Sequence, residues 1–237
     1  EEAEPVEKTT ESIVEEQAQE QSDCYHPFFP VVDGASWTYD DSFESGFTLT
    51  IEETSQDTFT MTQIIADEDA EFTVDWYCSE DGLLRGSFAQ MDLLNQSTVE
   101  EGSPEMTFET LVWEGETLPA PELMEVGYTW ISNYALSGEI NLEGFSQTME
   151  IKVSIDHEIG AIEEVIVPTG TFPEAYRVDS TGVIEMVMMM DEISTPFNNF
   201  DCNFSTWYVE GVGMVQSASE FSGFDADTVL VESSLLD

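Results

Sequence analysis

The chain has 237 residues, of which 51 are acidic and only four are basic, so its formal net charge is −47. Nucleic acid and anionic lipid head groups are bound by clusters of Lys and Arg, which displace counterions. The basic residues here, Lys8, Arg85, Lys152 and Arg177, lie far apart in the sequence. We therefore expect no nucleic-acid partner and no direct binding to an anionic membrane surface.

Hydrophobic residues make up 41% of the chain, with 15 Phe, 7 Tyr and 5 Trp, which is enough for a folded core. Acidic disordered chains are poor in such aromatic residues. The excess of acid over lysine suits a protein kept soluble in brine, so a halophilic source is one interpretation. No apolar run reaches the roughly 18 residues of a membrane span.

Residues 1–23 are rich in Glu and contain no aromatic residue. This composition predicts a disordered acidic tether, of the kind that follows the lipidated cysteine of a bacterial lipoprotein. We expect a single β domain over residues 24–237. The location is then extracytoplasmic, whether secreted, periplasmic or on the cell surface, and lipid anchoring stays open.

Hydrophobic and polar residues alternate with a period of two from residue 46 onward, which indicates half-buried strands. No window beyond residue 24 shows the pattern of an amphipathic helix. The pattern predicts an all-β antiparallel sheet with one packed face and one solvated, acidic face. The predicted strands lie at residues 47–51, 58–66, 71–78, 83–89, 106–113, 128–136, 149–155, 161–167, 174–190, 205–217 and 228–233.

Two signatures recur in the same order and suggest an internal duplication. A G-x-x-W motif at Gly34–Trp37 returns at Gly127–Trp130, and a Trp-Tyr-x4-Gly motif at Trp76 returns at Trp207. A turn glycine before an anchoring tryptophan gives a packing reason for the spacing. The predicted halves, which share one sheet, span residues 28–92 and 118–222.

Three cysteines, Cys24, Cys78 and Cys202, allow one disulfide and one remaining thiol. Zinc-site spacing is absent, and only His26 and His157 are available as imidazole ligands, so a structural disulfide is favoured. We favour Cys24 with Cys78, and the other pairings stay open. The histidines are expected to be satisfied surface or turn residues.

The chain resembles a loosely defined group of secreted bacterial proteins and lipoproteins. The matching pieces are Pro30-x3-Gly34-x2-Trp37-x-Tyr39, the V-P-x-G-x-F element at Val167–Phe172, and the closing strand around Gly211–Val215. Related architectures are similar to the unclosed, strongly bent sheet of periplasmic lipoprotein carriers. The resemblance implies a bent sheet or unclosed barrel that wraps an apolar or lipid-like ligand. The chain departs from the group at Gln216, where a basic residue is usual.

The sequence gives only weak signals for catalytic or metal-binding residues. Adjacent acids are abundant, but neighbours on a strand point to opposite faces and cannot share a site, so we predict no catalytic residues and no enzyme. A secreted hydrolase that uses two of the many acids stays open as a third interpretation. No cofactor is expected, although calcium is a candidate because hard cations bind carboxylates in loops. The candidate calcium ligands are Asp67, Asp69, Asp225 and Asp227.

We expect a non-enzymatic binding module whose bent sheet holds an apolar ligand or a partner segment. Thioether and aromatic side chains make adaptable apolar walls, and alternate residues of a Met-rich strand share one face. The predicted lining residues are Trp37, Trp130, Met186, Met188 and Met190. The alternative is a structural or interaction protein of an acidic cell envelope, assembled or stabilised by divalent cations that bridge it to a neighbouring envelope protein.

Overall fold

The computed structural model describes residues 24–42, 46–66, 70–87, 105–142, 145–190, 193–221 and 224–236. These residues form one antiparallel sheet of 13 strands, with a single short 3₁₀ helix at Pro121–Leu123. No helix in these ranges is both long and apolar enough to cross a membrane. The strands are β1 (Ser36–Asp41), β2 (Phe47–Thr54), β3 (Thr58–Ile65), β4 (Ala70–Ser79), β5 (Gly82–Arg85), β6 (Glu105–Glu114), β7 (Leu118–Pro119), β8 (Thr129–Leu142), β9 (Phe145–Val167), β10 (Gly170–Met190), β11 (Ile193–Val209), β12 (Gly213–Phe221) and β13 (Phe224–Ser233).

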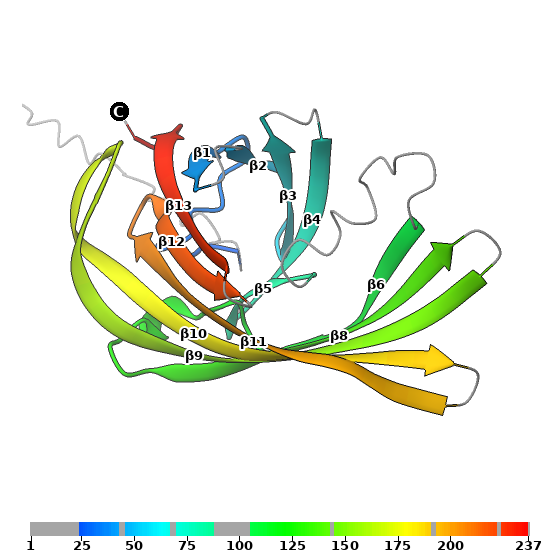
Figure 1. The fold of residues 1–237 in the computed structure, drawn as a ribbon. Coiled ribbons are helices and arrows are strands. Elements are labelled where there is room, and N and C mark those ends of the chain that lie inside the picture. Colours follow the sequence, from blue (N-terminus) through cyan, green and yellow to red (C-terminus); the bar gives the residue numbers. More distant parts are fainter. Residues whose placement is uncertain are drawn as a thin grey trace, which may run out of the picture.

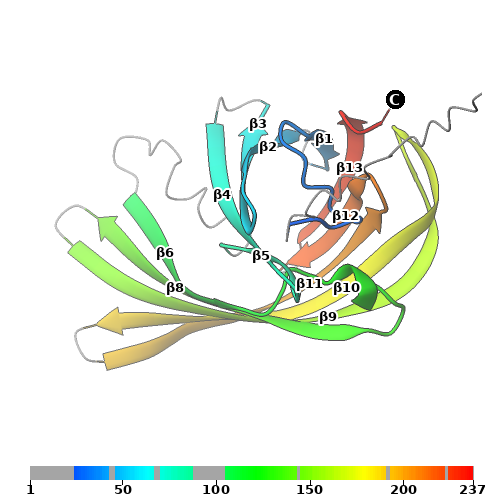
Figure 2. The same cartoon turned by 180° about the vertical axis from the view of Figure 1, so that it is seen from behind.

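The sheet is strongly bent and is not closed into a barrel (Figures 1 and 2). Its strand order is β6-β8-β9-β10-β11-β12-β13-β1-β2-β3-β4-β5-β7, so β6 and β7 form the two edges. Strand β9 has 23 residues, a length of about 75 Å at 3.3 Å per residue, and it runs across the whole molecule with β10. We call β6, together with the parts of β8, β9, β10 and β11 that lie beside it in the sheet, the distal half. The rest of these four strands and all the other strands form the proximal half. The predicted bent, unclosed antiparallel sheet is confirmed.

Alternation along β9 shows how the sequence produces the two faces. Ile151, Val153, Ile155, His157 and Ile159 are buried, whereas each residue between them is exposed. The intervening side chains are Lys152, Ser154, Asp156 and Glu158. The strand therefore has one packed face and one solvated, mostly acidic face, as its period of two predicts.

The proximal half surrounds a first apolar cluster, which the bent sheet encloses from several sides. Its largest members are Phe28, Trp37, Tyr39, Ile51, Phe59, Trp76, Trp130, Ile159 and Leu230. Two polar groups on aromatic side chains form hydrogen bonds to the backbone across this core. The Trp37 indole N–H donates to the Val212 carbonyl at 2.6 Å, and the Tyr39 hydroxyl donates to the Met214 carbonyl at 2.9 Å. These bonds fix β1 against the β11–β12 turn, more than 170 residues away.

A disulfide joins Cys24 to Cys78, the pairing that the sequence favours, while Cys202 is a buried free thiol. The bond fastens the segment before β1 to β4 and closes a loop of 54 residues. In the chain-entropy model a loop of this length is worth about 4 kcal/mol of stability.

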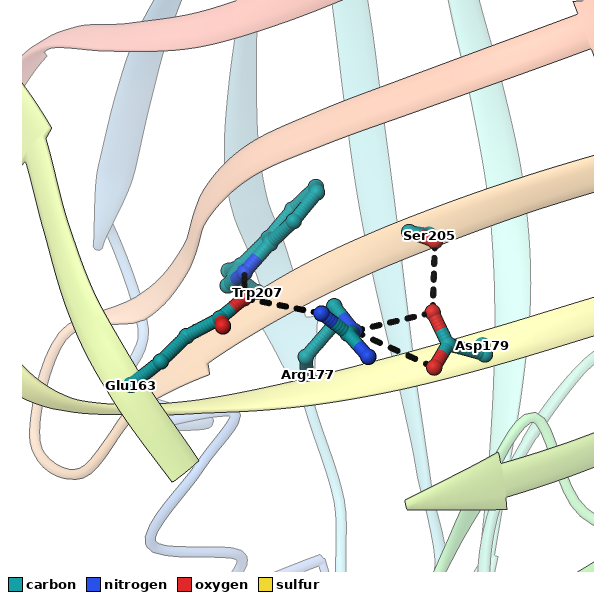
Figure 3. A network of polar contacts seen from close by, with 5 residues as sticks. All are labelled: Glu163, Arg177, Asp179, Ser205 and Trp207. Carbon is teal, nitrogen blue, oxygen red and sulfur yellow. Dashed lines mark hydrogen bonds and ion pairs between the residues drawn. The ribbon is translucent and has the colours of Figure 1, made fainter. Parts of the chain in front are cut away.

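A polar network holds the curve of β9 against β10 and β11 (Figure 3). The register of β9 and β10 shifts at Gly160, which is left unpaired as a bulge. Arg177 pairs with Glu163 at 3.2 Å and with Asp179 at 3.0 Å. The Trp207 indole donates to Glu163 at 2.7 Å, and the Ser205 hydroxyl donates to Asp179 at 2.6 Å. A Cβ atom at position 160 would overlap the Asp179 carboxylate, so the network requires glycine there.

The two G-x-x-W motifs have the same local geometry. The Gly34 N–H donates to the Ile51 carbonyl at 2.9 Å, and the Gly127 N–H donates to the Ile159 carbonyl at 2.8 Å. Both glycines have positive φ angles, +75° and +90°, which glycine adopts readily. In each case the tryptophan pairs with the residue two positions before that isoleucine, and a bulge follows the isoleucine.

The Trp-Tyr motifs match less well. Trp76 pairs with Phe59 and is buried, whereas Trp207 pairs with Arg177 and is only half-buried, with a bulge directly after it. A bulge shifts the pairing by one residue and so changes which residues face the core. The second motif therefore does not repeat the burial of the first. Duplicated halves stay a prediction.

Several strand boundaries differ from those predicted. The predicted strand 205–217 is two strands with a turn at residues 210–212, where Gly211 has a φ of +76°. The predicted strands 149–155 and 161–167 are one continuous β9, because the bulge at Gly160 bends the strand without ending it. Strands β1 and β7 were not predicted, because β7 has only two residues and β1 has only two apolar residues, Trp37 and Tyr39, before its acidic end. The predicted tether at residues 1–23 lies outside the described residues.

Candidate functional site

The distal half carries a second apolar cluster, which we call the distal face. Its members come from β6, β8, β9, β10 and β11, which are five consecutive neighbours in the sheet. These strands form a single layer in both views (Figures 1 and 2). No residue of a facing layer belongs to the cluster among the described strands. The members are Phe108, Tyr134, Leu136, Met149, Ile151, Val153, Ile155, Ile184 and Cys202, bordered by Met186, Met188, Phe200 and Phe204.

Register explains why these side chains gather on one face. Directly paired residues of neighbouring strands point to the same side of a sheet. Leu136 pairs with Ile151, which pairs with Met186, and in the next row Gly138 pairs with Met149, which pairs with Met188. Every member of the distal face is uncharged, whereas the charged residues of the same strands lie on the opposite face: Glu109, Glu139, Glu150, Lys152, Asp156, Glu185 and Asp201.

Two glycines shape the distal face. A Cβ at Gly138 would meet the Phe108 ring at 2.6 Å, and one at Gly182 would meet the Cys202 sulfur at 2.7 Å. Both partners therefore lie directly over the backbone of the neighbouring strand. Glycine in a strand often marks such a close approach, and here it lets the Phe108 ring and the Cys202 sulfur lie against the sheet.

The predicted lining residues do not form one site. Met186 and Met188 border the distal face. Met190 ends β10, and its side chain lies outside the described part of the structure. Trp37 belongs to the first cluster, 3% exposed, and Trp130 also belongs there at the boundary between the two halves. The methionines and Trp37 are separated because β1 pairs with β2 and β13, far from the distal strands in the sheet order.

An exposed aromatic pair that the sequence did not reveal borders the distal face. The rings of Tyr77 on β4 and Trp113 on β6 stack with centroids 5.6 Å apart and planes 17° apart. Each side chain is 37% exposed. Trp113 pairs with Tyr134, a member of the distal face, so it points to the same side of the sheet. Alternation with buried Trp76 could have placed Tyr77 on the outer side of β4, but its partner is a tertiary contact.

His157 lies where the two clusters meet and is buried. The Ser132 hydroxyl donates to the Glu116 carbonyl at 2.7 Å, so it must accept from His157 Nε2–H, at 2.9 Å. His157 Nδ1 is then the unprotonated nitrogen and accepts from the Ser180 hydroxyl at 2.7 Å. The imidazole also stacks on Trp130, with centroids 4.9 Å apart. Burial lowers the pKa of His157 to about 4, so the ring is neutral at neutral pH.

The contacts around His157 support a structural role. Ser132, His157 and Ser180 are only 1%, 6% and 3% exposed, and no carboxylate orients the imidazole among the contacts that the structure gives it. A nucleophile and base need access to a substrate, which burial denies them. Ser132, His157 and Ser180 therefore provide hydrogen-bond partners for one another in the core between the two clusters.

His26 is likewise buried. Its Nδ1 accepts from the Phe28 N–H at 3.2 Å, and its Nε2 donates to the Pro119 carbonyl at 2.9 Å. Burial lowers its pKa from the ordinary value. His26 opens a turn, as predicted, because its carbonyl accepts from the Phe29 N–H at 3.1 Å, although its side chain is buried. His157 differs from the predicted surface or turn residue, because hydroxyl partners satisfy it inside the core.

Only two of the four predicted calcium ligands lie within the residues that the structure describes. Asp67 and Asp69 lie outside the described residues, whereas Asp225 and Asp227 are exposed on β13 rather than in a loop. Phe224, Val229 and Leu230 continue the strand pattern around them, which extends β13 through the acidic pair. The ranges that the structure describes contain no group of three or more His, Cys, Asp or Glu side chains able to hold a metal ion.

Comparison with known proteins shows the fold alone. No protein-family model and no curated protein matches the chain. One similar crystal structure is a provisionally assigned exported protein with a YmcC-like fold from Bacteroides fragilis, at 14% identity and a TM-score of 0.53. Another is a provisionally assigned lipoprotein from Parabacteroides distasonis, at 16% identity and a TM-score of 0.52. Each match covers 87% of this chain and 98% of the other.

Proposed function

We propose that this protein is a non-enzymatic, extracytoplasmic binding module that holds an apolar ligand on its distal face. The observation that carries the proposal is the single layer of five strands with an entirely uncharged inner face. The nine members are at most 8% exposed, so a bound alkyl or lipid-like chain would contact the half-buried border of Met186, Met188, Phe200 and Phe204 and would reach the members only by displacing the side chains that bury them.

Two further features support the proposal. The border of the distal face holds two methionines, whose flexible side chains adapt to ligands of irregular shape, and two phenylalanines, whose rings add apolar area. The similar structures from Bacteroides fragilis and Parabacteroides distasonis are named as an exported protein and a lipoprotein, which favours an extracytoplasmic location. The disulfide between Cys24 and Cys78 fits an oxidising compartment.

Placing a carboxylate on the distal face tests the proposal. Met188→Glu puts a charge beside Met149, whereas Val183→Glu puts the same charge on the opposite, exposed face of the same strand. Burying an unpaired carboxylate against an apolar ligand is costly. We expect Met188→Glu to weaken binding of the neutral fluorescent probe N-phenyl-1-naphthylamine at least tenfold, and Val183→Glu to leave it within twofold.

The fold of both variants is checked by circular dichroism. Equal probe binding by the two variants, at unchanged secondary structure, would contradict binding at the distal face. Native mass spectrometry of the protein from its own source provides the second readout, since an apolar adduct should accompany the wild type and be lost from Met188→Glu.

A further inference from the structure

The two edges of the sheet differ in how much backbone they leave unpaired. At one edge β7 has only two residues, and one of them is Pro119, which has no N–H. At the other edge β6 has ten residues, Glu105–Glu114, and no proline. Among the strands that the structure describes, β6 pairs with β8 alone. Alternate N–H and C=O groups of β6 therefore point away from the sheet, where a further strand can bond to them.

A side-chain contact limits the accessible part of this edge to its N-terminal portion. The Tyr77 ring of β4 reaches Trp113, close to the C-terminal end of β6. From there β4 and β6 diverge toward the start of β6 in both views (Figures 1 and 2).

Apolar side chains are exposed in the middle of the edge. Leu111 is 54% exposed and Val112 is 44% exposed, although both belong to a strand. Leu111 is the extra residue of a bulge, and Val112 pairs with Ala135 of β8. Val112 and Ala135 lie in one row with Lys152, on the outer face of the distal half, and all three line a depression of about 320 Å³. An apolar contact surface is thus present beside the open backbone.

Acidic residues flank Val112 on the same outer face. Glu109 pairs with Ser137 and Glu114 pairs with Asn133, and both partners alternate with the buried residues of β8. Because of the bulge, Glu109, Val112 and Glu114 lie opposite every second residue of β8. A strand on the free edge would meet them at the same spacing. Opposite charges that face each other directly stabilise a sheet, so the matching order is basic, apolar, basic at alternate positions.

Charge and sequence both exclude a second copy of this chain as that strand. Two copies, each with a net charge of −47, repel one another, and two acidic edges repel most directly. The four basic residues of the chain, Lys8, Arg85, Lys152 and Arg177, lie far apart in the sequence. No segment of the chain therefore supplies two basic residues four positions apart, and the strand has to come from another protein.

We propose that the open edge of β6 binds an extended, basic segment of a partner protein, which adds a strand to the sheet. Main-chain hydrogen bonds provide the affinity, and the side chains of Glu109, Val112 and Glu114 select the segment. The acidic edge then has two effects, since it prevents copies of this chain from pairing and attracts a cationic partner. This contact is separate from ligand binding at the distal face, and either can exist without the other.

A capped peptide, acetyl-Thr-Lys-Thr-Val-Thr-Lys-Thr-amide, tests the proposal, because its symmetric order suits both parallel and antiparallel addition. Its titration into the ¹⁵N-labelled protein in 0.15 M NaCl locates the contact by NMR. We expect the amide shift changes to concentrate on Glu105–Glu114 and on the paired residues of β8. The same peptide with Glu in place of both Lys should bind at least tenfold more weakly.

Two N-methylated peptides of unchanged charge test the backbone pairing on the wild-type protein. One is methylated at its odd positions and the other at its even positions, so only one of them loses the N–H groups that face β6. We expect one to bind within threefold of the parent peptide and the other at least tenfold more weakly. Equal affinities of the two would overturn strand addition.

Matched double variants test the position of the contact. Glu109→Lys with Glu114→Lys reverses the charges beside Val112, whereas Glu164→Lys with Glu232→Lys reverses two exposed charges of β9 and β13 in the proximal half. The first should weaken the Lys peptide at least tenfold and bind the Glu peptide instead, and the second should stay within threefold of the wild type. Circular dichroism checks both folds.

Diffuse attraction to an acidic surface gives a different set of results. Equal weakening in the two double variants, or shift changes spread over the whole acidic surface, would overturn a site at β6. The absence of shift changes at 1 mM of the Lys peptide would overturn it as well.

Discussion

At the scale of single residues, His157 links folding to protonation. Its pKa is about 4 in the folded chain, against about 6.5 when unfolded. Between these values the unfolded state binds more protons, so stability is complete above about pH 6.5 and falls as the pH drops toward 4. The full difference amounts to roughly 3 kcal/mol. Burial also lowers the pKa of His26, which acts in the same direction.

Replacing His157 with Gln should flatten this pH dependence. Gln cannot be protonated, so the variant loses the contribution of His157 while His26 still titrates. We expect the free energy of unfolding in urea to fall between pH 7.5 and 5.5 by about 1 kcal/mol more in the wild type than in the variant. The variant should be less stable at pH 7.5, because it loses the stacking on Trp130. Parallel pH profiles would refute a neutral buried imidazole.

At the scale of strands and turns, the alternation of apolar and polar residues predicts the features that depend on the local sequence alone. It identifies most of the strands and the packed face of β9, since the period of two is a local property. It misplaces the turn at residues 210–212, because Val209, Val212 and Val215 continue an apolar run through it. Similarly, Asp225 and Asp227 look like loop residues although flanking residues hold them in β13.

Which residues meet at the candidate site depends more on strand order and register than on the alternation along any one strand. Trp37 and Met188 are both large apolar residues, and only the strand order places Trp37 in the first cluster and Met188 at the border of the distal face. The stack of Tyr77 on Trp113 joins β4 to β6, whose pairing partners are β3 and β5 for one and β8 for the other. Such contacts between non-neighbouring strands leave no periodic signal in a single sequence.

The bulge in β9 provides a prediction at this scale. Gly160→Ala should destabilise the protein by about 1–3 kcal/mol, because the new Cβ displaces the Asp179 carboxylate that Arg177 and Ser205 hold. Chemical denaturation of the single and double variants with Asp179→Ala measures the coupling. The double variant should be more stable than the sum of the two single effects predicts. Simple additivity would show that the overlap with Asp179 is not the cause.

At the scale of the whole molecule, charge opposes the compact state. Arg177 forms ion pairs with Glu163 and Asp179, but four basic residues cannot neutralise 51 acidic ones, so most carboxylates have no cation of their own. Asp225 on β13, for example, pairs directly with Glu220 on β12. Like charges opposite each other in a sheet are destabilising. Screening by salt shortens the range of this repulsion from about 30 Å at 0.01 M to about 3 Å at 1 M.

The melting temperature should therefore rise steadily with NaCl from 0.01 M to 1 M, by about 2–4 °C for each 1 kcal/mol of repulsion removed. Calcium chloride at equal ionic strength distinguishes screening from a specific site. A further rise with calcium, lost in Asp225→Asn with Asp227→Asn but kept in Glu150→Gln with Glu185→Gln, would place a calcium ion on β13. An equal response of all variants assigns the effect to diffuse screening. A melting temperature that does not change with salt would contradict charge repulsion as the main force against folding.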